Sequence, residues 1–384
     1  MIAAGDGKPM LSGIRVVDLS TVVFGPYATQ ILADFGAEVI KVEAPGGDGF
    51  RHAGRPAKSV GMGPAHIALN RNKKSVVLDL KQESERQRLR DLTATCDVFL
   101  HNVRTEAIDR LGFGYEAVRA LKPDVIYVHC VGFGSNGPYA GLQAYDDVIQ
   151  ALTGTTSLLS RVDGDPRPRY LPSLIADKVA GLHAAYATMA AVIHRLRTGE
   201  GQFVEVPMFE AFANFMLKEH LAGLTFDPPV GDACYARQVD PYRQPFPTSD
   251  GHISIVPYRP GHAQRVIALL GDPEFAAQER FAGIEGSIRH MPELYTRIGE
   301  LTATRTTEEV LAIMREAEMP AMPARDIAEV PGDPHLAQAG FFWHSEHPSE
   351  GQVLQMREPS RFSGWEMPEP APAPLIGEHG EEFG

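Results

Sequence analysis

The chain has 384 residues, 43% of them hydrophobic and 22% charged, a composition typical of a globular enzyme with two domains. Its formal net charge of −13 argues against a nucleic-acid partner, because binding phosphates along a strand needs a concentrated basic surface. A small anionic ligand can still be held locally by backbone amides and a few Lys or Arg side chains.

The start of the chain predicts a βαβ unit. Residues 14–19 and residues 39–42 are short apolar runs of strand length. Between them, apolar side chains recur at helical spacing from Ala28 to Phe35. Pro26 suits the first helical turn, where its missing N–H costs nothing, and Gly36 suits the helix end. Because the connection is short, we expect two parallel strands joined by a right-handed crossover.

Strands and helices continue to alternate over about the first 200 residues. The further strand candidates are residues 75–80, 97–101, 125–131 and 203–206, and the helix candidates are residues 82–95, 105–111 and 173–196. This alternation predicts an α/β domain with an open, mostly parallel, Rossmann-like sheet. Ligands of such sheets bind beyond the carboxyl ends of the strands, so we expect a site there.

The second half of the chain has a different character. A strand pair within residues 245–256 brackets Asp250-Gly251, which is a hairpin signal, and several helices are expected to follow. We therefore predict a large domain over residues 1–224 and a smaller α+β domain over residues 225–325.

Signals for disulfides, metals and membranes are weak. The three cysteines form no CxxC pair and the fourteen histidines show no metal-ligand spacing, so we predict neither a disulfide framework nor a metal site. The N-terminus lacks the apolar core of a signal peptide. The longest apolar stretch, near residues 174–193, contains charged residues and is expected to be a buried helix rather than a membrane span. We predict a soluble cytoplasmic protein with no membrane partner.

Residues 132–137 match the GxGxxG pattern and follow a predicted strand. A dinucleotide site requires a helix to begin at that point, with its N-terminus facing the pyrophosphate. Here Pro138 to Gly141 follow instead, which predicts a loop. We interpret the segment as a glycine loop that lines some other pocket.

Asp177 is the most unusual residue on physical grounds. It falls near the start of a helix that is otherwise apolar, and a buried charge is costly unless it is paired or hydrogen-bonded. Two interpretations stay open from the residues alone. Asp177 is either an acid favoured by the helix dipole or a functional group.

A second feature with two interpretations is the basic stretch from Asn70 to Ser75. It reads either as a solvated turn before a strand or as an anchor for a phosphorylated ligand. Glu43, at the end of the second strand, would suit a ribose-binding acid. The preceding turn, residues 20–26, lacks the glycines that cradle a phosphate, so this signal is weak.

Runs of residues along nearly the whole chain resemble the class III CoA-transferase family, also called the CaiB/BaiF type. The early matches are residues 17–26 (VDLSTVVFGP), 32–43 (LADFGAEVIKVE), 70–81 (NRNKKSVVLDLK), 107–113 (AIDRLGF) and 132–134 (GFG). The late matches are residues 244–251 (QPFPTSDG), 304–309 (TRTTEE), 333–335 (DPH) and 377–380 (GEHG). The family includes formyl-CoA and carnitine CoA-transferases and the α-methylacyl-CoA racemases.

The resemblance implies that Asp177 is the nucleophile. In similar enzymes the carboxylate attacks the donor acyl-CoA to form a mixed anhydride, and the CoA thiolate returns to give an aspartyl-CoA thioester. An acceptor carboxylate then takes the CoA through a second anhydride. CoA and acyl-CoA are thus substrates, small carboxylic acids are the partners, and no tightly bound cofactor is expected.

The resemblance also implies the positions of the other site residues. The residues expected to contact CoA are Val22, Val23, Phe24, Asn70, Lys73, Asn102, Val103, Arg110 and Leu111. The expected substrate and oxyanion loop consists of Gly132, Phe133, Gly134 and Tyr145, whose backbone amides could stabilise tetrahedral oxyanions. For the phosphates, the candidates are Lys73, Lys74 and Arg110. Ala44 and Val131 stand where some relatives carry a basic residue, so Arg51 or Arg104 could compensate.

The alternative within the family is a racemase that exchanges the α-proton of a 2-methylacyl-CoA. That branch needs a second acid/base, usually a histidine ahead of the catalytic aspartate. Tyr145 occupies that position here, and a tyrosine with an ordinary pKa near 10 is a poor proton acceptor at pH 7. The sequence therefore favours a transferase, and transfer within one diacid stays open.

Further expectations concern the assembly, the acceptor acid and the class of protein, and the first of them follows from the resemblance. Two chains are expected to interlock as a homodimer, with the large domain completed by residues 326–384. Arg167, Arg169 and Tyr170 are candidates for binding the acceptor carboxylate, although an exposed turn explains them equally well. A non-catalytic acyl-CoA-binding protein is the alternative from another class, and the presence of Asp177 among the full set of motifs disfavours it.

Overall fold

The computed structural model describes residues 7–383, and the chain forms two compact units. The first unit combines the chain up to Thr156 with Tyr170–Lys218 and the segment from Gln338 onward. The second unit combines Ser157–Arg169 with Glu219–Ala337. The sequence had predicted domain boundaries after residues 224 and 325, and the corresponding changes from one unit to the other come after Lys218 and Ala337.

The centre of the first unit is a six-stranded sheet in the order β3-β2-β1-β4-β5-β6. Its strands are β1 (Arg15–Asp18), β2 (Glu38–Glu43), β3 (Lys73–Val77), β4 (Val98–His101), β5 (Ile126–Val131) and β6 (Gln202–Pro207). All five neighbouring pairs are parallel, so the predicted open, Rossmann-like sheet is confirmed. The chain reverses its direction of winding between β1 and β4, and ligands bind at such a switch point in related sheets.

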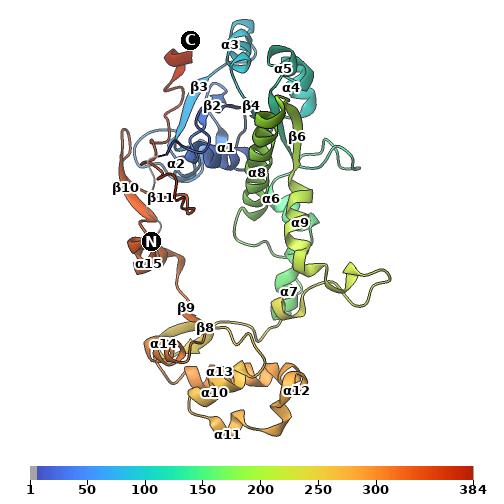
Figure 1. Cartoon of the computed structure of the whole chain (residues 1–384), viewed down its shortest axis with the longest axis vertical. Helices are drawn as coiled ribbons and strands as arrows, with labels where there is room; N and C mark the ends of the chain where they lie inside the picture. Colours follow the sequence, from blue (N-terminus) through green and yellow to red (C-terminus); the bar gives the residue numbers. More distant parts are fainter. Residues whose placement is uncertain (1–6, 384) are drawn as a thin grey trace. The chain divides into compact units, whose positions relative to one another are not determined.

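Helices cover both faces of this sheet (Figure 1). The helices of the first unit are α1 (Phe24–Asp34), α2 (Pro64–Asn70), α3 (Glu83–Ala94), α4 (Thr105–Leu111), α5 (Tyr115–Leu121), α6 (Asp146–Leu152), α8 (Ile175–Thr198) and α9 (Met208–His220). On one face, apolar side chains of α3, α4 and α5 pack on strand residues in one buried cluster. On the other face, α1 packs closely on α8. Gly181 permits this approach, because a Cβ there would lie 2.9 Å from the Phe24 carbonyl oxygen.

Helix α8 corrects one expectation from the sequence. It was predicted to be buried, yet Leu182, Tyr186, Ile193 and Leu196 recur at helical spacing on an exposed face. The buried face carries small residues such as Ala180 and Ala184, which is why the apolar composition misled the prediction. Among the described helices, none is both long and apolar enough to cross a membrane.

The second unit contains a small antiparallel sheet and several helices. Its strands are β7 (Phe246–Thr248), β8 (Gly251–Ile255) and β9 (Ala321–Pro323), and its helices are α7 (Leu158–Asp163), α10 (His262–Leu269), α11 (Pro273–Ala276), α12 (Gly283–Arg289), α13 (Met291–Thr302), α14 (Thr307–Glu316) and α15 (Pro334–Gln338). Strands β7 and β8 form the hairpin predicted at Asp250-Gly251. The helices α10, α13 and α14 pack on this sheet around a separate apolar core.

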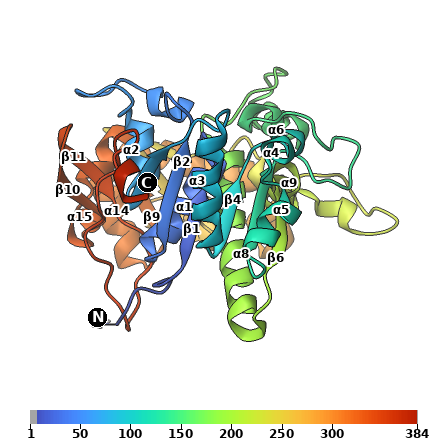
Figure 2. The same cartoon turned by 90° about the horizontal axis from the view of Figure 1, so that it is seen from above.

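The C-terminal segment returns to the first unit. It forms the antiparallel hairpin of β10 (Phe342–His347) and β11 (Gly351–Met356), which lies beside α2 (Figure 2). The Glu350 carboxylate accepts the backbone N–H groups of Lys58 and Ser59, and Arg71 donates to the Met356 carbonyl. The large unit therefore needs residues from both ends of the chain.

Candidate active site

A cavity of about 470 Å³ opens at the carboxyl ends of β1, β4 and β5. The β1–α1 turn and the β4–α4 connection form one side of it, which places the cavity at the switch point of the sheet. The end of β5, the loop that follows it and the first turn of α8 form the rest. This volume lies within the range of small-molecule sites.

Asp177 lines this cavity from the first turn of α8, and only 6% of the residue is exposed. Burial raises the pKa of its carboxyl to about 7, and the negative charge of Asp146 adds to the effect. Within residues 7–383, the carboxylate of Asp177 accepts no hydrogen bond and pairs with no cation that would lower its pKa again. The arrangement leaves a desolvated carboxylate facing the cavity.

Asp146 holds the start of α8 in place. Its Oδ1 atom accepts the backbone N–H groups of Ala176 at 2.7 Å and Asp177 at 3.1 Å, although α8 has no capping side chain of its own at Leu174. Gln150, one turn further along α6, donates to Asp146 Oδ2 and accepts the Leu171 N–H. Asp146 therefore fixes the backbone of Asp177 and also acts on its charge.

Most of the residues expected to bind substrate meet at this cavity. Those that line it are Val22, Phe24, Asn102, Val103, Gly132, Phe133 and Tyr145, together with Asp177. Those that do not line it are Val23, Asn70, Lys73, Arg110, Leu111 and Gly134. Val23 is buried at the start of α1, Arg110 is exposed on α4, and Leu111 packs against the core of the sheet.

Asn70 and Lys73 belong to a buried network beneath α1. The Lys73 ammonium donates to Asn70 Oδ1 at 2.9 Å, Thr29 Oγ1 at 2.8 Å and the Pro26 carbonyl at 2.8 Å. It also lies 3.5 Å from Asp18. Burial lowers the pKa of Lys73 to about 7 despite the charge of Asp18. With its donors used internally, Lys73 is a structural cation here, and the expected phosphate contact does not fit this geometry.

The other basic candidates differ sharply in their surroundings. Arg51 is fully buried and forms a pair with Glu43, and Lys74 bridges Glu38 and Glu382 at the surface. Arg167 and Arg169 are paired with Asp165 and Asp163, which favours the exposed-turn interpretation of that segment. By contrast, Arg104 lines the cavity and is the one permanent cation among the described residues that do so.

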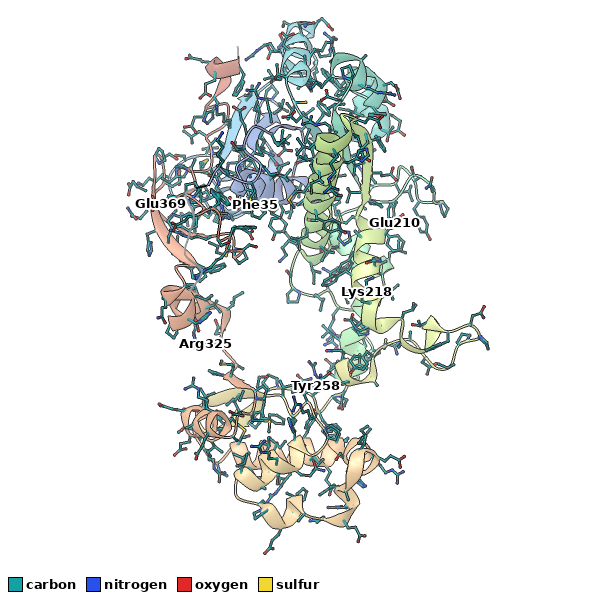
Figure 3. The ribbon with its side chains drawn as sticks, viewed as in Figure 1. Phe35, Glu210, Lys218, Tyr258, Arg325 and Glu369 are labelled. Atoms are coloured by element: carbon teal, nitrogen blue, oxygen red, sulfur yellow. The ribbon has the colours of Figure 1, made fainter. Side chains whose placement is uncertain are left out.

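The glycine loop is held by two glutamates that sequence reasoning missed. Glu210, labelled in Figure 3 on α9, accepts the Gly134 N–H at 2.9 Å. Glu205, at β6, accepts the Ser135 N–H at 3.0 Å. The resemblance had implied that the Gly134 amide is free to stabilise an oxyanion. In this conformation it is not free, because it donates to Glu210. Gly132 still requires glycine, because a Cβ there would lie 2.6 Å from the Cβ of Ala144.

His129 is a further cavity residue that the sequence did not single out. Its Nε2 atom lies 3.0 Å from the Val103 carbonyl oxygen, which ties β5 to the β4–α4 connection. Burial lowers the pKa of His129 below its ordinary value, so the imidazole is neutral at pH 7. Its lone position on a strand offered no motif by which to predict this contact.

The fold and the cavity together define an α/β protein with a buried acidic side chain in its ligand-binding crevice. Comparison with known proteins identifies the class. Residues 11–380 match the model of CoA-transferase family III, so the chain belongs to this family. It is a class III CoA-transferase, acting on acyl-CoA and carboxylate substrates.

Individual relatives align over nearly the full chain. The succinate–glutarate CoA-transferase of Agrobacterium fabrum is 32% identical over 97% of this chain and 94% of its own length. The human succinyl-CoA:glutarate CoA-transferase is 31% identical over 97% of this chain and 84% of its own. A crystal structure of a CaiB/BaiF family protein from Brucella suis is similar with a TM-score of 0.85, at 31% identity, over 98% of this chain and 99% of that one.

Proposed function

We propose that the chain transfers CoA through covalent intermediates on Asp177. The carboxylate attacks the carbonyl carbon of the donor thioester, the C–S bond breaks, and CoA leaves as the thiolate from a mixed anhydride. The thiolate attacks the Asp177 carbonyl carbon of that anhydride, which releases the donor acid and forms an aspartyl-CoA thioester. The acceptor carboxylate repeats the sequence in reverse, takes the CoA and regenerates the Asp177 carboxylate.

The observation that carries this proposal is the unpaired Asp177 carboxyl in the cavity at the switch point of the sheet. Its pKa, raised by burial to about 7, is far above that of an ordinary carboxylate, and a more basic oxygen is a stronger nucleophile. A desolvated site also limits the access of water, which would hydrolyse an anhydride. Strongly shifted pKa values of this kind cluster at functional sites.

The rest of the cavity supplies contacts for CoA and the acids. We assign the CoA contacts to Val22, Phe24, Asn102 and Val103, with Arg104 as the cation for a phosphate or carboxylate. Relatives named for succinyl-CoA with glutarate or mesaconate, and for formyl-CoA with oxalate, support a small carboxylic acid as the acceptor.

Hydroxylamine trapping tests the proposal directly. Wild type incubated with a panel of acyl-CoAs and hydroxylamine should acquire a hydroxamate that peptide mass spectrometry maps to Asp177. The Asp177→Ala variant should acquire none, and Asp147→Ala, which removes the exposed acid one residue after Asp146, should react like wild type. If no acyl-CoA gives an adduct and wild type instead exchanges an α-proton with deuterated solvent, the racemase alternative replaces this proposal.

The proposal includes an interlocked homodimer, and the cytoplasm as its compartment. The support for a dimer is the exposed apolar face of α8, where Leu196 is 72% exposed in the single chain. Patches of this kind mark interaction sites in soluble proteins. Ile193→Glu should weaken the dimer, whereas Val60→Glu, at an exposed apolar residue outside α8, should not. Sedimentation velocity measures the difference, and an unchanged dimer in Ile193→Glu argues against this surface.

A further inference from the structure

The turn between β1 and α1 has an unusual backbone. Val22, which lines the cavity with Asp177, has a φ of +72°. This left-handed region is strained for a residue with a branched Cβ, and it persists only where the surroundings impose it. The following residue, Val23, is the N-cap of α1 and has no side chain that can accept a hydrogen bond. Helix α1 therefore begins without a side-chain cap from its own N-cap residue.

Side chains from three other segments hold this turn. Lys41 Nζ, from β2, donates to the Ser20 carbonyl at 2.9 Å. The Asn102 amide, after β4, accepts the Thr21 N–H at 3.0 Å and donates to the Thr21 carbonyl at 2.9 Å. The Asp48 carboxylate accepts the Val22 N–H at 3.2 Å. The backbone groups that lead into the left-handed residue are thus each bound by a side chain.

Asp48 and Lys41 form a buried ion pair at 3.1 Å, and their residues are 4% and 0% exposed. Asp48 also accepts the Phe50 N–H at the start of a short 3-10 helix, Gly49–His52. Apolar residues of similar volume would often be at least as stabilising in such a place, so a buried pair calls for another role. Neither residue lines the cavity, but both contact the turn that does.

We infer that Asp48 is a positioning residue for CoA binding: with Lys41, it imposes the left-handed conformation of Val22 and so shapes the wall of the cavity. The inference rests on the proposed function, since it takes the ligand of this wall to be the CoA thioester. Neither Lys41 nor Asp48 lines the cavity, so they would act on CoA only through the turn. Their loss should therefore weaken CoA binding and leave the pKa of Asp177 unchanged.

Two double variants compare position 48 with and without a side-chain oxygen that can accept backbone N–H groups, those of Val22 and Phe50. Both Lys41→Met/Asp48→Asn and Lys41→Met/Asp48→Ala remove the ion pair, so neither leaves an unpaired buried charge. Only the first keeps a side-chain oxygen that can accept the Val22 N–H. A third variant adds Val22→Gly to the alanine form, because glycine adopts positive φ without the penalty of a Cβ. Isothermal titration with CoA gives Kd for each, and steady-state kinetics gives KM, kcat and their pH dependence.

The alanine form should bind CoA roughly tenfold more weakly than the asparagine form, about the effect of one strained residue on an equilibrium constant. KM for acyl-CoA should rise in parallel, and the acid limb of the kcat profile should keep its midpoint. Val22→Gly should recover part of the lost affinity, because it removes the strain of the positive φ but also a side chain that lines the cavity. Equal Kd values for the two double variants, or a loss that Val22→Gly leaves unchanged, would overturn the inference.

A less invasive variant covers the case in which the alanine form does not fold. Compared with wild type, Lys41→Met/Asp48→Asn loses the ion pair and the Lys41 donation to the Ser20 carbonyl, both outside the cavity lining, and should bind CoA several-fold more weakly with an unchanged pH midpoint. Wild-type affinity in this variant contradicts the inference. The outcome is separable from that of the proposed function: a wild type that binds no CoA defeats the function, whereas a wild type that binds CoA and variants that bind equally defeat only this inference.

Discussion

Replacement of Asp177 by alanine is expected to abolish CoA transfer, with kcat falling by at least about 10⁴-fold. Alanine has no oxygen to attack the thioester, so neither the anhydride nor the aspartyl-CoA thioester can form. Binding should survive, because the residues assigned to CoA lie on the β1–α1 turn and the β4–α4 connection rather than on α8. Initial rates with a donor acyl-CoA and an acceptor acid, followed by chromatography of both CoA esters, measure the loss.

Asp147→Ala is the matched control for this experiment. It makes the same change at an exposed acid in the first turn of α6, next to Asp146, and should keep kcat within about twofold of wild type. A titration with CoA should give similar Kd values for both variants. Residual transfer by Asp177→Ala above about one per cent of the wild-type rate would contradict a covalent role for this side chain.

Local sequence patterns predicted the sheet correctly because each strand is encoded in a short run. Val16 and Val17 in β1, and Val39 and Ile40 in β2, are fully or almost fully buried, so the apolar runs marked them without ambiguity. The helix between them was predicted from its spacing and from Gly36, which adopts a φ of +92° at its end. The parallel pairing then follows from short crossovers, whereas the strand order was not predicted.

The candidate site was harder to predict because its contacts join distant residues. Asp177 stood out in the sequence as an acid near the start of an apolar helix, and the family resemblance implied its role. Asp146, however, binds the start of α8 from 30 residues earlier, and Glu210 holds Gly134 from 76 residues later. No spacing rule in the sequence reports such pairs. The same limit explains Lys73, whose basic stretch gave no sign that Asp18 and Thr29 would surround it.

Buried cations near the switch point are paired with acids, whereas Asp177, within the described part of the chain, is not paired. The buried cations Lys73, Lys41 and Arg51 are paired with Asp18, Asp48 and Glu43, and each also donates to a backbone carbonyl. Asp177 has no such partner among the described residues and faces Asp146 instead. A cation beside Asp177 would lower its pKa and weaken it as a nucleophile. Under the proposed mechanism, its isolation keeps the carboxylate reactive.

Wild-type kcat is expected to fall as the pH decreases through about 7, because the protonated carboxyl of Asp177 cannot attack a thioester. Asp146→Asn removes the neighbouring charge and keeps an oxygen that can accept the N–H groups of Ala176 and Asp177. The midpoint of the acid limb should then shift to lower pH by roughly one unit, the smaller end of the range for a nearby like charge. Burial remains, so the midpoint should stay above the ordinary value of 3.8.

The raised pKa must also appear in the stability of the protein, which gives a check that does not involve substrate. Because the folded-state pKa of Asp177 lies above its unfolded value of 3.8, the folded state binds the extra proton between these values, and stability decreases as the pH rises through that window. This loss in the free energy of unfolding is absent below about pH 4 and complete above about pH 7, where it amounts to roughly 4 kcal/mol.

The variant Asp177→Asn carries no charge to desolvate, so at pH 8 it should unfold at a higher urea concentration than wild type. The difference between the two urea midpoints should be smaller at pH 5. Asp147→Asn, at the exposed neighbour, should follow wild type at both pH values. If the difference in urea midpoint between Asp177→Asn and wild type is the same at both pH values, the Asp177 carboxyl of wild type titrates normally and its reactivity has another source.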